Sequence, residues 1–231
     1  MTEVLTVEQP CRIELECPAD VHAPGPSSQE LARYLFSVKG KSVLDLGCGT
    51  GIFALVAARL GARDVWATDV SSAAVETTRR NAARNGLEVH VKQGDLFEPV
   101  RGRRFDVIVT NPPQTPAPPE ARGPKFGGED GLRYFRTILR EAPRHLDDGG
   151  QLLTFLISLA DTSTFERLLG ETFRFRPLPK SRREFTPLEY DSYWPGLFDF
   201  LQDRRRRGLA EFEEENGRFF YWVRYYMAMK K

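Results

Sequence analysis

The sequence predicts a doubly wound α/β fold, in which a mostly parallel seven-stranded sheet has helices on both faces and an antiparallel last strand. Two observations support this prediction. From Lys41 onward, short β-branched runs alternate with longer runs of helical period, which is typical of a parallel sheet covered by helices. Glycines follow several of the helical runs, at the point where a helix end favours a left-handed residue.

These runs give the expected elements in order. We place strands at 42–46, 64–68, 88–92, 105–110, 150–156, 173–177 and 219–227, and helices at 52–60, 72–85, 132–145 and 162–169. Gly61, Gly86 and Gly170 are the expected helix C-caps. Ahead of the sheet, a helix should begin at Ser27, because Ser27 and Glu30 have the spacing of a capping box.

The chain divides into four expected segments. Residues 1–26 form an N-terminal arm that includes a hairpin or irregular stretch, and residues 27–185 form a ligand-binding core. Residues 186–217 form an insert of one or two helices that is rich in aromatic side chains, and residues 218–231 complete the sheet. The insert is a candidate substrate cap, although simple packing of an extra helix would also explain any one of its aromatic residues.

Composition argues against several kinds of function without excluding nucleic acid. The 33 Lys and Arg residues nearly balance 32 Asp and Glu residues, so no global field draws the protein to nucleic acid or to an anionic membrane. The three cysteines have no paired metal-ligand spacing, so we expect no metal and a reducing compartment. The sequence shows no leader pattern and no apolar run long enough for a membrane span, which predicts a cytoplasmic protein. Oligomeric state is left open.

A glycine-rich turn follows the first expected core strand. Asp45 lies near the end of that strand, and Gly47, Gly49 and Gly51 follow at alternate positions. Missing Cβ atoms let a ligand approach the backbone, and the helix that follows offers unpaired N–H groups to an anionic group. Dinucleotide-binding proteins space their glycines G-x-G-x-x-G, whereas the spacing here is G-x-G-x-G. The turn therefore favours a different nucleotide ligand, although a purely structural turn would explain the triplet alone.

Carboxylates follow the next two expected strands. Asp69, with Val70 after it, stands where a carboxylate can accept hydrogen bonds from both ribose hydroxyls of a nucleoside. Asp95 can accept from an adenine amino group, and Leu96 can offer its N–H to the adenine ring. Open α/β sheets bind ligands at the carboxyl ends of their strands, so the glycine turn and the two carboxylates together predict an adenosine site.

The fourth core strand ends in a turn that indicates the substrate. The turn is Asn111-Pro112-Pro113-Gln114. The prolines fix the turn and remove backbone donors, so the Asn111 side-chain oxygen and the Pro112 carbonyl can both accept from one NH₂ group. The nitrogen lone pair would then point towards a ligand bound at the adenosine site. A proline-rich structural turn is the alternative, because Pro116 and further prolines follow at once.

With these residues in place, the chain resembles the class I S-adenosylmethionine-dependent methyltransferases, and within them the release-factor glutamine methyltransferases. The resemblance covers about Val21 to Phe185. Its motifs are 45–51, Asp69, 81–86, 94–97, 105–109, 111–113 and the run Phe126-Gly127-Gly128-Glu129-Asp130-Gly131-Leu132. The resemblance implies a Rossmann-like methyltransferase fold, S-adenosyl-L-methionine as methyl donor and S-adenosyl-L-homocysteine as product.

The resemblance implies a specific cofactor or substrate contact for each of these residues. The three turn glycines would pass under the methionine moiety, Asp69 would hold the ribose, Asp95 with Leu96 would hold the adenine, and Asn111 would orient the nitrogen. The family usually has an aromatic residue where this chain has Gln114, and a helical domain ahead of the core. We therefore expect Pro113 and Gln114, with Tyr193 and Trp194 of the insert, to contact the substrate.

These inferences predict an N-methyltransferase acting on an amide or amino nitrogen of protein glutamine or of a small natural-product scaffold. Asn111 and Pro112 are the expected catalytic residues, and Asn111 is also expected to contact both the cofactor and the substrate. Methyl transfer from a sulfonium needs alignment and desolvation rather than a nucleophilic side chain, so we expect no catalytic histidine. The alternatives are a small-molecule O- or C-methyltransferase, a methyltransferase of nucleic-acid bases and a non-catalytic cofactor-binding partner subunit.

Overall fold

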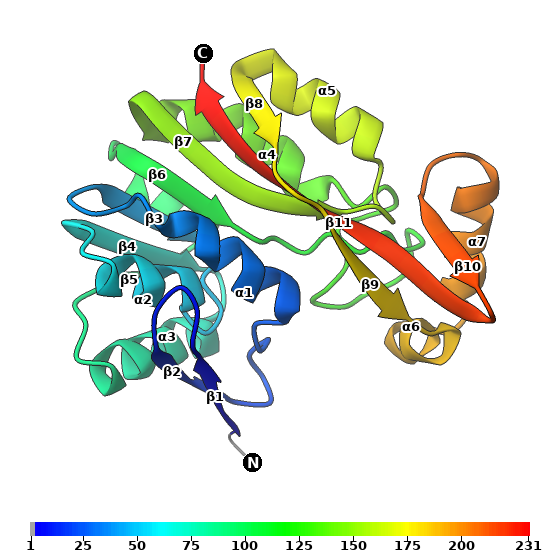
Figure 1. Cartoon of the computed structure of the whole chain (residues 1–231), viewed down its shortest axis with the longest axis horizontal. Helices are drawn as coiled ribbons and strands as arrows, with labels where there is room; N and C mark the ends of the chain where they lie inside the picture. The colour runs from blue at the N-terminus through cyan, green and yellow to red at the C-terminus, as the bar shows by residue number, and fades with distance from the viewer. Residues whose placement is uncertain (1–2) are drawn as a thin grey trace. The chain divides into compact units, whose positions relative to one another are not determined.

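The structure is a computed structural model that describes residues 3–231 (Figure 1). These residues separate into two compact units. Unit 1 contains the described residues through Asn111, together with Glu141–Thr154 and Met229–Lys231. Unit 2 contains Pro112–Arg140 and Phe155–Ala228. Met1 and Thr2, with which the expected arm begins, lie outside the described residues.

Unit 1 is built on parallel strands. They are β3 (Ser42–Leu46), β4 (Asp64–Asp69), β5 (His90–Gln93), β6 (Phe105–Thr110) and the first part of β7 (Leu146–Ile157). Their order is β7-β6-β3-β4-β5, and Leu46 of β3 lies opposite Thr68 of β4 and Thr110 of β6. The central strand β3 is buried along its whole length. Because all these pairings are parallel, the strands end at one common edge of the sheet.

Helices of unit 1 pack against this sheet and against an N-terminal hairpin. They are α1 (Pro26–Ala32), η1 (Arg33–Leu35), α2 (Ile52–Arg59), α3 (Ser72–Arg84), η2 (Glu98–Val100) and η3 (Ala142–His145). Helices α2 and α3 contact strands β3, β4 and β5. The hairpin, β1 (Glu3–Val7) and β2 (Ile13–Cys17), is antiparallel, and β2 lies against α3 (Figure 1). The expected arm is therefore a hairpin.

Local sequence signals located most helix ends of unit 1, with one exception. Gly61 and Gly86 are left-handed, as expected, and each directly follows the C-cap of its helix, Leu60 of α2 and Asn85 of α3. The predicted capping box of Ser27 and Glu30 is wrong. Pro26 starts α1 instead, with Gly25 as an N-cap that makes no side-chain bond, because proline is well suited to the first helical position.

Unit 2 carries the remaining helices and strands. They are α4 (Arg133–Glu141, whose last residue belongs to unit 1), α5 (Thr162–Thr172), β8 (Phe173–Pro177), β9 (Ser181–Phe185), α6 (Pro187–Tyr193), α7 (Leu197–Arg206), β10 (Phe212–Glu215) and β11 (Arg218–Lys230). Strand β11 pairs antiparallel with β9 and β10, and β8 also pairs with it. The fold class is confirmed as mostly parallel with an antiparallel last strand, and the insert contains two helices as expected.

Two predictions for unit 2 need correction. Gly170 is not a C-cap, because α5 continues to Thr172 and Phe173 closes it in extended conformation. Strands β9 and β10 were not predicted, because their charged sequences lack the apolar alternation of a half-buried strand. Their charges are matched instead across the sheet, where Arg182 of β9 lies 2.6 Å from Glu215 of β10.

The loop that opens unit 2 is fixed by a second glycine-rich segment, 126–132. The Gly127 N–H donates to the Thr115 carbonyl, and the Thr115 N–H donates to the Lys125 carbonyl. A Cβ at Gly127 would lie 2.8 Å from the Gln114 Cα, and one at Gly131 would lie 2.5 Å from the Gln114 carbonyl oxygen. The backbone of segment 126–132 therefore lies so close to the backbone of Gln114 that no side chain fits between them at Gly127 or Gly131.

We predict that Gly131→Ala destabilises the protein more than a glycine substitution in open space. Gly131 (φ 81°) and Gly196 (φ 79°) are both left-handed, but a Cβ at Gly196 would meet no atom within 4 Å. Gly196→Ala should therefore cost only about 1 kcal/mol of backbone strain, and Gly131→Ala about 2–4 kcal/mol because steric overlap adds to it. Urea unfolding measures both; equal losses would contradict the close packing of Gly131.

Candidate functional site

Asp45 is the buried acidic residue behind the glycine turn. Its side chain has no exposed surface, and its Oδ2 accepts a hydrogen bond of 3.0 Å from the Ala54 N–H of α2. Among residues 3–231, Oδ1 has no hydrogen-bond partner. Burial raises the pKa of Asp45 to about 7; the Ala54 N–H opposes this shift and the negative charge of Asp69 adds to it. A cationic group in front of Asp45 would satisfy this carboxylate.

The glycine turn lies just after Asp45 and is held by backbone hydrogen bonds to β4. Gly47, Gly49 and Gly51 are all left-handed, with φ of 78°, 54° and 86°. The N–H groups of Gly47 and Cys48 donate to the Thr68 carbonyl of β4, at 2.8 and 3.0 Å. A Cβ at Gly47 would meet no atom within 4 Å, so the space beside Gly47 is open. This open space leaves room for a ligand beside the Gly47 backbone, and the ligand contact itself stays a prediction.

Gly51 has a different role, because it packs against helix α3. A Cβ at Gly51 would lie 2.8 Å from Thr78 Cγ2. The Thr78 hydroxyl donates to the Gly49 carbonyl at 3.0 Å. Helix α3 therefore packs against the turn at Gly51 and binds it at Gly49.

Asp69, at the end of β4, is fixed by two backbone donors. Its Oδ2 accepts from the Gly49 N–H and its Oδ1 from the Ser71 N–H, both at 2.9 Å. Each carboxylate oxygen has further acceptor capacity, so a pair of hydroxyls can still bind. The neighbouring Val70 is 67% exposed, and it offers apolar surface beside this carboxylate.

Asp95 and Leu96 follow β5 at the same edge of unit 1. The Gly94 N–H donates to the Asp69 carbonyl at 3.0 Å, and the Thr68 hydroxyl donates to the Leu96 carbonyl at 3.2 Å. Asp95 is exposed, and Leu96 is left-handed with φ of 44°, a conformation that costs energy for a leucine. The three predicted cofactor segments thus lie next to one another along the ends of β3, β4 and β5.

Asn111 ends the first segment of unit 1 just after β6. Its Nδ2 donates to the Ser28 hydroxyl of α1 at 3.1 Å, and Ser28 is buried. The preceding Thr110 is anchored twice, since its hydroxyl donates to the Leu46 carbonyl and its carbonyl accepts from the Thr154 hydroxyl. Sequence analysis missed Ser28, because the serine next to it was interpreted as a helix cap and the partner is 83 residues away.

Pro112, Pro113 and Gln114 open unit 2. The Gln114 amide is buried and lies along strand β7, where its Nε2 donates to the Phe155 carbonyl at 3.3 Å. Its Oε1 accepts from the Ile157 N–H at 2.8 Å. These bonds fix the turn to the strand. Substrate contact by Pro113 and Gln114 stays a prediction, and the geometry gives the Gln114 side chain an anchoring role.

The aromatic residues of the insert divide into packed and half-buried groups. Tyr190 packs on Phe185 with ring centroids 5.0 Å apart, as expected for a structural residue. Tyr193 and Trp194 are half-buried, and the Tyr193 hydroxyl donates to Glu189 at 2.7 Å. Lys125, which sequence analysis missed, has its ammonium 3.7 Å from the centre of the Tyr193 ring.

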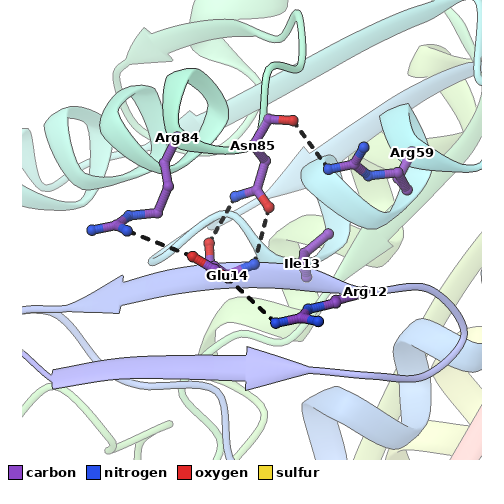
Figure 2. Close-up of a pocket in the computed structure, with 6 residues that line it drawn as sticks. All are labelled: Arg12, Ile13, Glu14, Arg59, Arg84 and Asn85. Carbon is purple, nitrogen blue, oxygen red and sulfur yellow. Dashed lines mark hydrogen bonds and ion pairs between the residues drawn. The ribbon is translucent and has the colours of Figure 1, made fainter.

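A hollow in unit 1 lies apart from every predicted site residue. This cavity of about 500 Å³ is lined by Arg12, Ile13, Glu14, Arg59, Arg84 and Asn85 (Figure 2). It lies where strand β2 meets the ends of α2 and α3. Within residues 3–231 no group of three or more His, Cys, Asp or Glu side chains could hold a metal, and no helix is long and apolar enough to span a membrane.

Comparison with known proteins identifies relatives of this chain. A Methanocaldococcus jannaschii protein whose name proposes N5-glutamine methylation of proteins is 30% identical over 79% of this chain and 95% of its own length. The Geobacter sulfurreducens release factor glutamine methyltransferase is 40% identical over 52% of this chain. The Escherichia coli ribosomal RNA small subunit methyltransferase C is 36% identical over 60% of it. The chain spans 47% and 39% of those two proteins.

A solved structure has the same fold. The T. thermophilus 16S rRNA N2 methyltransferase, determined with AdoMet and guanosine, aligns with a TM-score of 0.63 at 24% identity. The alignment covers 78% of this chain and 48% of that protein. The family model described as the methyltransferase small domain matches residues 24–188, more than half of the sequence. The chain therefore belongs to the methyltransferase small domain family and is an S-adenosylmethionine-dependent methyltransferase.

Proposed function

We propose that this enzyme methylates an amide or amino nitrogen, and that the side-chain amide of a protein glutamine is its substrate. The observation that carries the proposal is the fixed orientation of Asn111, whose Nδ2 is held by buried Ser28. With the NH₂ group directed at Ser28, the side-chain oxygen is the acceptor that Asn111 offers to a substrate NH₂. The glutamine relatives support this choice of substrate.

The residues of unit 1 fit the methyl donor. The buried Oδ1 of Asp45 has no partner among residues 3–231 and suits the ammonium of a methionine moiety, and the open space at Gly47 admits its backbone-like chain. Asp69 would hold the ribose hydroxyls, with Val70 against the adenosine, and Asp95 with Leu96 would hold the adenine. These assignments support S-adenosyl-L-methionine as cofactor and S-adenosyl-L-homocysteine as product.

The protein contributes position more than acid–base chemistry in this proposal. When bound, S-adenosyl-L-methionine would supply a methyl group on a sulfonium, and neutral S-adenosyl-L-homocysteine would be the leaving group when a nitrogen lone pair attacks that methyl group in line. Asn111 and the Pro112 carbonyl would accept the two N–H bonds of the substrate and leave the lone pair pointing at that methyl group. The nitrogen loses its surplus proton to water after transfer, so no side chain has to act as a base before the methyl group moves.

A second candidate is methylation of an amino group on a nucleic-acid base, which the E. coli ribosomal RNA relative favours. An Asn-Pro-Pro turn could hold such an amino group in the same way. The arginine run 204–207 gives this candidate little support. Arg204 is buried and donates to the Leu209 carbonyl, and Arg207 lies 3.6 Å from Asp203. Methylation of oxygen or carbon in a small molecule, or a role as a non-catalytic subunit, has no specific observation in its favour.

A label-transfer experiment separates these candidates. Purified enzyme and radiolabelled S-adenosyl-L-methionine are added to a cell lysate, and the label is followed after protease or ribonuclease treatment. The proposal predicts label in protein, with mass spectrometry locating it on a glutamine side-chain nitrogen. Label in RNA would establish the second candidate instead, and label in neither fraction would overturn both.

Asn111→Ala and Ser28→Ala test the orientation of the substrate. Asn111→Ala should lower kcat by about 100-fold, and Ser28→Ala by about 5- to 20-fold, because the amide keeps its acceptor but loses its fixed orientation. Cofactor affinity, measured by calorimetry, should change less than twofold in Ser28→Ala. Full activity of Asn111→Ala at unchanged cofactor affinity would refute the role of Asn111.

The raised pKa of Asp45 predicts how stability depends on pH. In the unfolded chain this carboxyl titrates near 3.8, whereas in the folded protein it titrates at about 7. Between these values the folded state binds more protons, so the contribution of Asp45 to stability is full at low pH and falls as pH rises towards 7. The stability of the wild type relative to Asp45→Asn should drop by up to about 4 kcal/mol between pH 4 and pH 8. Urea unfolding measures the free energy of unfolding of both proteins at both pH values. The same difference between the two proteins at pH 4 and at pH 8 would contradict this prediction.

A further inference from the structure

Two asparagines on α3 hold strand β2 of the N-terminal hairpin. Asn85 accepts from the Glu14 N–H at 2.9 Å and donates to the Glu14 carbonyl at 2.7 Å (Figure 2). Asn81, one helical turn earlier, accepts from the Glu16 N–H at 2.7 Å and donates to the Glu16 carbonyl at 3.1 Å. Each side-chain amide thus pairs with one strand residue through both backbone groups, as a neighbouring strand would.

The two asparagines differ in one further bond. Asn81 also donates to the Thr50 carbonyl of the glycine turn at 2.9 Å. The second bond of the Asn85 NH₂ group is to the Asn81 carbonyl within α3, at 2.8 Å. Asn81 has no exposed surface and Thr50 is 2% exposed, so water cannot replace the bond between them. Both donor hydrogens of Asn81 are therefore used, one on the hairpin and one on the turn.

Helix α3 binds two successive carbonyls of the turn. Thr78 donates to the Gly49 carbonyl at 3.0 Å, and Asn81, three residues later on the same face of the helix, binds the carbonyl of Thr50. With these carbonyls directed towards α3, the Gly49 N–H is free to donate to Asp69. The conformation of the turn thus depends on two side chains of α3, those of Thr78 and Asn81.

We infer that Asn81 is a positioning residue for the cofactor: by binding Glu16 and Thr50 with one amide, it couples the N-terminal hairpin to the glycine turn. The inference rests on the proposed cofactor assignment of that turn. A turn that is already fixed in its binding conformation loses less entropy when ligand binds, so binding is tighter. Asn85 holds the same hairpin without reaching the turn, which makes it a matched control.

The test compares Asn81→Ala with Asn85→Ala. Each variant removes one side-chain amide from the same helix and leaves one β2 residue without its partner. In the ligand-free proteins, hydrogen exchange of peptides covering residues 47–55 should accelerate about tenfold in Asn81→Ala and less than twofold in Asn85→Ala. The dissociation constant for S-adenosyl-L-homocysteine, measured by calorimetry, should rise about tenfold in Asn81→Ala and less than twofold in Asn85→Ala, since one buried hydrogen bond is lost only in the former.

A second pair, Asn81→Asp and Asn85→Asp, keeps the side-chain shape and covers the case in which Asn81→Ala does not fold. Asn81→Asp retains an acceptor for the Glu16 N–H but sets a carboxylate oxygen against the Glu16 and Thr50 carbonyls. It should loosen the same peptides, and Asn85→Asp should not. Equal exchange and equal dissociation constants within either folded pair would overturn the inference.

A different result of the same experiments would contradict the proposed function rather than the role of Asn81. If wild-type protein does not bind S-adenosyl-L-homocysteine, the cofactor assignment of the turn is wrong, whatever the variants show. The exchange measurement needs no ligand, so it still decides whether Asn81 holds the turn.

Discussion

The site depends on one constraint: a buried parallel strand must turn sharply and present its backbone to a ligand without leaving that backbone unpaired. Strand β3 meets this requirement because the neighbouring strand β4 supplies the acceptors. The Thr68 carbonyl takes two N–H groups of the turn, and the Asp69 carboxylate takes a third, from Gly49. Asp69 therefore holds the turn in shape with the same carboxylate that we propose binds the ribose. Loss of that carboxylate would disturb the glycine turn as well as the proposed ribose contact.

Sequence located the parts of the site that local chemistry determines. Strands β3 and β6 begin and end where the apolar runs predicted, and the polar residues after β3, β4 and β5 lie at one edge because parallel strands must end together. The residues that hold these groups in place could not be found in this way. Ser28 and Asn111 are 83 residues apart, and Gln114 meets β7 more than 40 residues later. Such partners are chosen by the folded topology, and no short-range pattern marks them.

Gln114 shows how a family pattern can change its meaning. The family that the chain resembles usually has an aromatic residue at this position, where it would contact the substrate. In this structure the Gln114 amide is instead buried against the β7 backbone. Gly127 and Gly131 lie directly against the main chain of the same residue, so that main chain has little room to move. The Gln114 side chain therefore offers no aromatic contact, and contact of the substrate with half-buried Tyr193, beside the Lys125 ammonium, stays a prediction. Burial lowers the pKa of Lys125 and the Glu189 carboxylate opposes the shift, so the Lys125 ammonium beside Tyr193 is partly desolvated.

One kind of interaction recurs in both units. Asn81 and Asn85 on β2, and Gln114 on β7, each use a side-chain amide to pair with backbone N–H and C=O groups at a strand. An amide suits this task because it has a donor and an acceptor side by side, whereas a carboxylate has acceptors only and an ammonium has donors only. Two of these amides, those of Asn81 and Gln114, hold a turn on which the proposed chemistry depends. The loops after β3 and β6 are thereby fixed without lengthening either strand, which leaves the backbone beyond each strand end available to a ligand.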